Sequence, residues 1–267
     1  MESLKRYGSW ALITGASAGI GKEFAHQLAR SGLNLVLVAR REAELQKIKI
    51  DLEQSHGINA RTLVCDLTNQ NALSLIIDAT RDLEIGLLVN NAGIAYPGSF
   101  LKNSLDRLRK TVNLNSVLPM ELAHEYGRQM ASRGRGAIIF VSDHIAYFPV
   151  PYASDYAASK SFILNFGEAL AYELKNVGVD VLVLSPGPTD TAMRKLEGID
   201  FSKMPLSWMS ASKTVGVALR SLGKTHSVVP GLLNKLMLWA FQIFIPRPVL
   251  VRLNGWMTKR ALASDRL

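Results

Sequence analysis

The amino-acid sequence predicts a single α/β domain built on a doubly wound parallel sheet. Short, near-continuous apolar runs alternate with longer amphipathic stretches along most of the chain. Strands that are apolar at every position are typical of a parallel sheet with both faces covered, and helices between them provide the crossovers. The length of 267 residues fits one domain of this class, so we expect a single domain over 1–267 with right-handed crossovers.

Apolar runs bounded by turn or charged residues mark the strands. The first, Trp10 to Ile13, leads into a glycine-rich turn, and the second lies between Gly32 and Arg40. We expect the strands at 10–13, 33–38, 61–65, 86–90, 137–141, 179–184 and 227–229. The amphipathic stretches between them predict helices at 22–31, 42–55, 69–81, 104–132, 154–176 and 211–222.

Composition narrows the class of protein. Hydrophobic residues make up 48% of the chain and charged residues 20%, which indicates a folded globular protein rather than a disordered one. Cys65 is the single cysteine, so no internal disulfide can form, as is usual in a reducing compartment. The first residues lack the apolar run of a signal peptide. We therefore expect a cytoplasmic location.

The net charge of +9 lies entirely in the C-terminal part. Residues 194–267 contain 12 Lys and Arg but only 3 Asp and Glu, whereas residues 1–193 contain 19 of each kind. Such a segment attracts nucleic acid, a membrane surface or an anionic substrate, unless it is simply a solvated basic surface. Neither a Cys/His finger pattern nor a basic stripe with interleaved aromatics is present, so we expect no nucleic-acid partner.

A glycine-rich turn between the first strand and the first helix predicts a phosphate-binding site. Its sequence runs from Thr14 to Gly21, with glycines at 15, 19 and 21 and with Ser17 and Ile20 between them. Glycines let the backbone approach a pyrophosphate, and the N–H groups and dipole of the following helix favour the anion. The alternative is an ordinary glycine turn.

This Thr-Gly-x-x-x-Gly-x-Gly spacing resembles the short-chain dehydrogenase/reductase family. A second segment, Asn90-Asn91-Ala92-Gly93, follows the fourth expected strand, and the resemblance covers about residues 8–193. It implies a Rossmann-like fold and a nicotinamide cofactor, with the residues Gly15, Ser17, Gly19, Ile20, Gly21, Asn91, Ala92 and Gly93 beside that cofactor.

The end of the second strand favours NADP(H) over NAD. A carboxylate there would bind the ribose 2′-hydroxyl and repel a 2′-phosphate, but the sequence reads Arg40-Arg41. The planar guanidinium of Arg40 can pair with the phosphate, and Ser17 is a candidate second donor. A surface arginine pair is the alternative. By resemblance, Asp66 and Leu67 at the end of the third strand meet the adenine.

Tyr156 and Lys160 open a predicted helix and are the candidate proton-transfer pair. Residues four apart share one helical face, and a nearby ammonium lowers the pKa of a phenol, so Tyr156 can serve as an acid or base. By resemblance, Lys160 also holds the nicotinamide ribose. Asn113 matches the family's helix asparagine, which holds a water in the proton relay, and Asn115 is a weaker candidate. The resemblance also places Pro186, Gly187, Thr189 and Thr191 beside the nicotinamide amide. We expect no metal site.

One position departs from the family pattern. The family places a serine thirteen residues before the tyrosine, but Asp143 stands there, with Ser142 one residue earlier. An ionised carboxylate only accepts hydrogen bonds, and it raises the pKa of a neighbouring phenol. Three interpretations remain open: a protonated Asp143 that donates, an Asp143 that binds a polar or cationic substrate, or reduced activity. His144 could form an ion pair with Asp143, although a structural role is the commoner one.

The C-terminal part lies outside the resemblance. Residues 192–225 correspond to the family's variable substrate lid, where Met193, Met204, Trp208 and Met209 suggest a partly apolar pocket. In the extension 231–267, the apolar run Leu232 to Ile245 is too short for a membrane span, which needs roughly 20 residues. Its apolar and basic residues could lie on an anionic membrane, but we favour packing against the sheet or a partner subunit.

The sequence therefore predicts an NADP(H)-dependent oxidoreductase acting on a carbonyl or alcohol of a lipophilic small molecule. The competing hypothesis is an NADPH-binding scaffold or regulatory protein whose catalysis is impaired by Asp143. By resemblance, the helices at 104–132 and 154–176 form the contacts of a homodimer or homotetramer.

Overall fold

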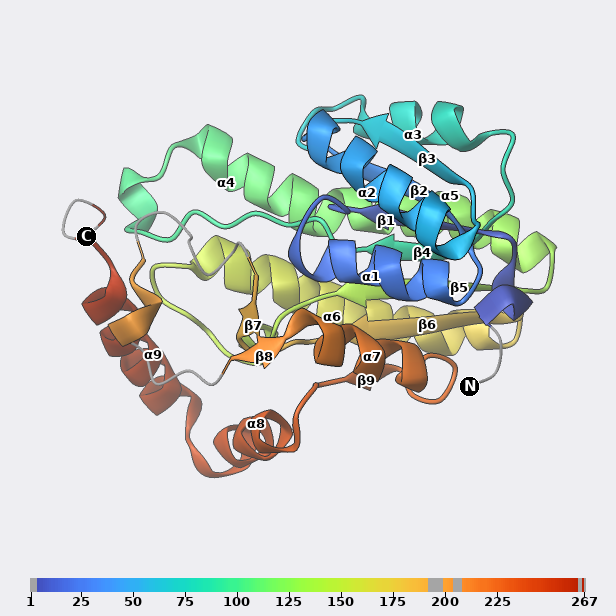
Figure 1. Cartoon of the computed structure of the whole chain (residues 1–267). Helices are drawn as coiled ribbons and strands as arrows, with labels where there is room; N and C mark the ends of the chain where they lie inside the picture. The colour runs from blue at the N-terminus through green and yellow to red at the C-terminus, as the bar shows by residue number, and fades with distance from the viewer. Residues whose placement is uncertain (1–3, 192–198, 204–207, 264–265, 267) are drawn as a thin grey trace.

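A computed structural model describes residues 4–191, 199–203, 208–263 and 266 (Figure 1). Within them, seven parallel strands form one sheet in the order β3-β2-β1-β4-β5-β6-β9. The strands are β1 (Trp10–Thr14), β2 (Asn34–Ala39), β3 (Ala60–Val64), β4 (Ile85–Asn90), β5 (Gly136–Val141), β6 (Val179–Leu184) and β9 (Ser227–Val228). The predicted doubly wound α/β fold is confirmed, and each predicted strand is present.

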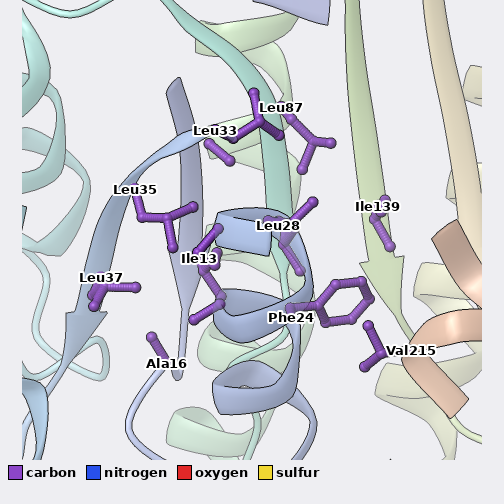
Figure 2. Close-up of a cluster of buried hydrophobic side chains, with 14 of the residues drawn as sticks. Ile13, Ala16, Phe24, Leu28, Leu33, Leu35, Leu37, Leu87, Ile139 and Val215 are labelled. Atoms are coloured by element: carbon purple, nitrogen blue, oxygen red, sulfur yellow. The ribbon is translucent and has the colours of Figure 1, made fainter. Parts of the chain in front are cut away.

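Helices cover both faces of the sheet. They are α1 (Gly19–Arg30), α2 (Glu42–His56) and α7 (Ala211–Ser221) on one face, and α3 (Ala72–Thr80), α5 (Leu118–Ser132) and α6 (Ser154–Lys175) on the other. Successive strand residues point to opposite faces, so Ile13 joins the first core cluster and Leu12 the second. Figure 2 shows Phe24 and Leu28 of α1 packed between the strands and Val215 of α7.

The predicted helix over 104–132 is divided into three parts, so its continuity was wrongly predicted. A helix α4 (Leu105–Val112), capped by the Ser104 hydroxyl, passes into a π-helical turn (Asn113–Val117) before α5 begins. Pro119 in the first turn of α5 has no N–H, so the α-helical bond to the carbonyl of Asn115 cannot form there. Such π-turns are frequent at functional sites.

The C-terminal part adds elements outside the main sheet. Two short strands, β7 (Thr189–Asp190) and β8 (Met209–Ser210), pair with each other and were not predicted. Met193 and Met204 of the predicted lid lie outside the described residues. The extension forms two helices, α8 (Leu232–Phe244) and α9 (Arg247–Ala261). Of the helices described, none combines the length and apolar character needed to cross a bilayer.

Candidate active site

The glycine-rich turn leads into the uncapped backbone N–H groups at the start of α1, and its glycines lie close to neighbouring protein atoms. Gly15 adopts φ +68°, and a Cβ there would lie 2.8 Å from Nδ2 of Asn91. A Cβ on Gly21 would collide with the carbonyl oxygen of Gly15 and with the same amide. Ala18, the residue before the helix, has no side-chain oxygen to cap it. The predicted glycine turn can therefore accept an anion at this helix start.

Thr14 ties this turn to the segment that follows β4. Its hydroxyl accepts hydrogen bonds from the backbone N–H groups of Asn91 (3.0 Å) and Ala92 (3.1 Å). The Asn91 amide in turn donates to the carbonyl of Thr14 at 2.8 Å. Thr14 is a positioning residue that was not among the predicted site residues, although it is the first residue of the glycine motif.

The two arginines after β2 have different surroundings. Arg41 reaches back to the glycine turn, where its Nη2 donates to the hydroxyl and the carbonyl of Ser17, both at 3.1 Å. Arg40 is exposed and lies near Asp66. The pKa of Asp66 is lowered, chiefly by the backbone N–H of Thr68 and also by the charge of Arg40. Ser17 was expected to act with Arg40, but in the structure it contacts Arg41. Leu67 is buried.

Tyr156 and Lys160 lie in the first turns of α6, and both are buried. The Nζ of Lys160 donates to the carbonyl of Val141 at the end of β5 (2.9 Å) and lies 5.7 Å from the centre of the Tyr156 ring. Burial lowers the pKa of Lys160 to about 8. A Cβ on Gly93 would lie 3.3 Å from this Nζ, so the segment after β4 passes beside the lysine. The structure thus brings Tyr156, Lys160 and Gly93 together.

Asp143 lies two residues after the end of β5 and faces Tyr156. The Tyr156 hydroxyl donates to Oδ2 of Asp143 at 2.9 Å, and Oδ1 accepts from the backbone N–H of Ile145. The Nδ1 of His144 lies 2.8 Å from Oδ1, an ion-pair distance. Burial raises the pKa of Asp143, but the charge and hydrogen bond of His144 outweigh it, and the net pKa is lowered. The structure therefore favours an ionised Asp143 that accepts a hydrogen bond from the Tyr156 hydroxyl.

The same contact affects the tyrosine. Burial raises the pKa of Tyr156 well above its ordinary value, and the negative charge of Asp143 raises it further. Ser142 cannot take over as hydroxyl donor to a ligand, because its Oγ is buried and donates to the carbonyl of Lys160 at 2.8 Å. The site therefore contains a neutral phenol whose O–H already points at a carboxylate.

Asn115, and not Asn113, lies beside the lysine. Asn113 is exposed, whereas the Asn115 side chain is buried and bonds both the N–H and the C=O of Ile94 at 2.9 Å. Its amide also donates to the hydroxyl of Ser159 at 3.1 Å. The structure thus places the weaker candidate, Asn115, among these groups and Asn113 at the surface, while the role of either residue in a proton relay stays a prediction.

This difference in burial between Asn113 and Asn115 predicts unequal effects of two alanine substitutions on stability. Asn115→Ala leaves the buried backbone groups of Ile94 unpaired, so we expect the free energy of unfolding to fall by about 2–4 kcal/mol. Asn113→Ala at the surface should change it by less than about 0.5 kcal/mol. Urea unfolding of both variants measures the difference. Equal effects would contradict the assignment.

The turn after β6 completes the site. The carbonyl of Pro186 accepts the backbone N–H of His144 at 2.9 Å, which joins this turn to the Asp143 region. Thr189 donates its hydroxyl to the carbonyl of Gly187 at 2.9 Å. A Cβ on Gly19 would lie 3.0 Å from the Thr191 side chain, so Thr191 lies against the glycine turn.

Comparisons with known proteins identify the family of this chain. The model of the family described as short chain dehydrogenase matches residues 9–200. A relative is human 17-beta-hydroxysteroid dehydrogenase type 3, 33% identical over 250 residues that cover 89% of this chain and 78% of the relative.

Two solved structures have similar folds. One, from work on the stereoselectivity of 7beta-hydroxysteroid dehydrogenase, has a TM-score of 0.88 and 28% identity and covers 95% of this chain and 99% of its own. The other, a short-chain dehydrogenase from Sphingobium yanoikuyae in complex with NADPH, has a TM-score of 0.77 and 32% identity, with coverage of 83% and 86%. The chain therefore belongs to the short-chain dehydrogenase/reductase family of oxidoreductases.

Proposed function

We propose that this protein transfers a hydride between the nicotinamide of NADP(H) and the carbonyl or alcohol carbon of a lipophilic small molecule. The observation that carries the proposal is the cluster of Tyr156, Lys160 and Asn115 beside the segment that follows β4, which Thr14 ties to the glycine turn. The cofactor supplies the redox chemistry when bound, and the protein supplies position and electrostatics.

The residues around the glycine turn fit a phosphorylated dinucleotide. The start of α1 offers backbone donors to a pyrophosphate, and Gly15 and Gly21 let the turn pack closely against the segment that follows β4. Arg41, held against Ser17, presents a guanidinium where a 2′-phosphate is expected after β2, and no carboxylate replaces it. The NADPH-bound relative from Sphingobium yanoikuyae is consistent with this preference.

Removing these arginines should change the cofactor preference. We expect Arg41→Ala to raise the KM for NADPH by about 10- to 100-fold, because a charge-assisted hydrogen bond is worth about 1.5–3 kcal/mol. The KM for NADH should stay within about twofold, and Arg40→Ala should have a smaller effect than Arg41→Ala. Initial rates with both cofactors measure this. The NADPH assignment would be wrong if kcat/KM with NADH equalled kcat/KM with NADPH and if neither Arg40→Ala nor Arg41→Ala changed these values.

Tyr156 is the residue that would move the proton. In carbonyl reduction the Tyr156 hydroxyl donates its proton to the substrate oxygen, and in alcohol oxidation the Tyr156 oxygen accepts a proton from the substrate hydroxyl. A positive Lys160 favours the phenolate by its charge, and its position at Val141 and Gly93 places it to hold the ribose hydroxyls. Asn115 fixes the backbone of Ile94 beside this lysine, which makes it a positioning residue.

The described part of the lid supports a lipophilic substrate. The rings of Phe201 and Trp208 lie edge to face with centroids 5.8 Å apart, and Ile199 pairs with Leu262 beyond α9. Named relatives act on hydroxysteroids, which are large and apolar. We therefore propose that the substrate is a lipophilic ketone or alcohol of steroid or acyl-chain type. The loss of NADPH absorbance with each member of a panel of steroid ketones tests this proposal.

A second candidate function is an NADPH-binding protein with little turnover. The hydrogen bond from Tyr156 to Asp143 favours it, because the tyrosine's proton is directed at a carboxylate and away from a substrate. Cofactor binding without NADPH oxidation across a broad carbonyl panel would select this function.

We further propose a homodimer or homotetramer formed through α4, α5 and α6. Exposed apolar side chains on these helices include Val112, Met120, Phe162 and Tyr172. Analytical ultracentrifugation measures the mass, and a monomer at micromolar concentration would contradict the proposal.

A further inference from the structure

We propose that α8 and α9 dock the protein onto the surface of an anionic lipid bilayer. The two helices lie on the outside of the molecule, away from the helices that cover the sheet (Figure 1). Eleven of their large apolar side chains are exposed, including Leu232 (74%), Phe244 (69%) and Trp256 (60%). The others are Leu233, Leu236, Met237, Trp239, Ile243, Val249, Val251 and Leu253. These eleven residues are called the apolar surface below.

The sequence favoured packing of this extension against the sheet or a partner subunit; the structure does not place most of it against the sheet, and packing against a partner subunit stays untested. Only Leu238 of α8 and three residues of α9 are buried within the described structure, and neither helix contributes to the two core clusters. Large contiguous exposed apolar surfaces mark contact with a protein or a membrane. The physical question is which of these covers the apolar surface.

The charges around the apolar surface favour an anionic partner. Residues 232–261 contain five basic residues and no acidic one. All five are exposed: Lys235, Arg247, Arg252, Lys259 and Arg260. The guanidinium of Arg260 also lies 5.6 Å from the ring centre of Trp256, so a cation and an amphipathic aromatic are presented together. Basic residues near an anionic membrane each add attraction, and tryptophan suits the interface.

A second copy of this chain is the weaker occupant. A twofold contact through α8 and α9 would bring the same basic residues of both copies together without an acid between them, and like charges repel. An anionic bilayer neutralises these charges and accepts the apolar side chains as well. The charge pattern therefore favours an anionic lipid surface, and not a second copy, as the partner of the apolar surface.

The lengths of the helices fix how they would lie. Helices of 13 and 15 residues are about 20 Å long, which is shorter than the roughly 30 Å of hydrocarbon in a bilayer. They would therefore lie in the plane of the interface, with their apolar side chains at the boundary between headgroups and acyl chains.

The helices are joined to the loop that follows Asp143. The rings of Phe241 in α8 and Phe148 are 6.4 Å apart, and the Asn254 amide of α9 donates to the carbonyl of Pro149 at 3.0 Å. Docking would thus hold the Asp143–Tyr156 region close to the lipid. The docking proposal does not depend on turnover, since vesicle binding can be measured without a substrate.

Vesicle flotation of the full chain tests the proposal. Vesicles of pure phosphatidylcholine are compared with vesicles that contain 30 mol% phosphatidylglycerol, a composition chosen as about one anionic lipid in three. We expect binding to the anionic vesicles, weak binding to the neutral ones, and a fall in binding as salt is raised.

Paired variants separate charge from apolar contact. Arg252→Gln/Lys259→Gln/Arg260→Gln should weaken binding by about two orders of magnitude, since each basic residue contributes about fivefold. Its control, Arg30→Gln/Lys47→Gln/Lys224→Gln, removes the same charge from exposed positions outside α4, α5 and α6 and should bind as the parent does. Trp239→Ser/Phe244→Ser should also lose binding, whereas Ile50→Ser/Leu101→Ser, at exposed apolar positions elsewhere, should not.

Three outcomes would overturn the proposal. The first is a parent protein that stays unbound at low salt. The second is equal weakening by the two charge variants, which would show a response to net charge alone. The third is a dimer that dissociates in Trp239→Ser/Phe244→Ser while no variant binds vesicles, which would make a second copy the occupant. Circular dichroism of each variant confirms that it is folded.

Discussion

Tyr156→Phe should lower the rate of carbonyl reduction by about 10²- to 10⁴-fold and leave NADPH binding nearly unchanged. The substitution removes only the hydroxyl that would give its proton to the substrate oxygen, and general acid catalysis is worth about this much. The ring remains to fill its buried site on α6. Steady-state NADPH oxidation measures the rate, and titration of NADPH fluorescence measures cofactor affinity.

Tyr152→Phe is the matched control for this substitution. Tyr152 lies four residues earlier in the loop before α6 and has no lysine four residues on, so its loss should cost less than about twofold. If Tyr156→Phe retained more than a fifth of the parent's rate, Tyr156 would not be the proton donor. If the parent itself lacked turnover while binding NADPH, the scaffold function would be selected.

Asp143→Asn should raise kcat/KM for ketone reduction by about 10- to 100-fold. The amide has nearly the shape of the carboxylate but offers N–H donors, and it removes the negative charge that raises the pKa of Tyr156. A donor aimed at a developing oxyanion is worth about 10²- to 10³-fold in other enzymes, so a gain of this size is reasonable. Asp143→Ser, which restores the family residue, should show a gain in the same direction.

The opposite result has an equally definite meaning. A collapse of activity in both variants would show that Asp143 has a dedicated role, for example in binding a polar or cationic group of the substrate. His144→Gln is informative beside them, because losing the imidazolium 2.8 Å from Oδ1 should raise the pKa of Asp143. Rates of each variant between pH 5 and pH 9 separate a charge effect from a loss of folding.

The fold was predictable because buried parallel strands are apolar at almost every position. Each of the seven strands of the main sheet was recognised from such a run, and the helix ends were placed to within a few residues, apart from the interrupted helix. The glycine turn and the Tyr156–Lys160 pair were predictable for a related reason, since close spacing along the chain fixes them locally. The two-residue strands β7 and β8 gave no comparable signal.

Features that depend on orientation were not predictable in the same way. Asn113 is exposed and Asn115 is buried, and both belong to a π-helical turn. Sequence periodicity assumes 3.6 residues per turn, so it could not show which of the two faces the interior. Arg40 and Arg41 are neighbours at a strand end, and only the path of the chain into α2 selects the one that meets Ser17. The apolar run of α8 looked like core because composition alone does not show what lies opposite a helix.

The strand order of the main sheet has a consequence for how the chain assembles. After β1 is made, β2 and β3 add on one side, and β4, β5, β6 and β9 then add in turn on the other. No later strand has to insert between two that are already paired, so the sheet can grow outward in the order of synthesis. Until β4 arrives, however, one edge of β1 is open, and open edges are where nascent chains aggregate. A pause in synthesis after β3 has left the ribosome and before β4 has done so would present this edge for as long as the pause lasts.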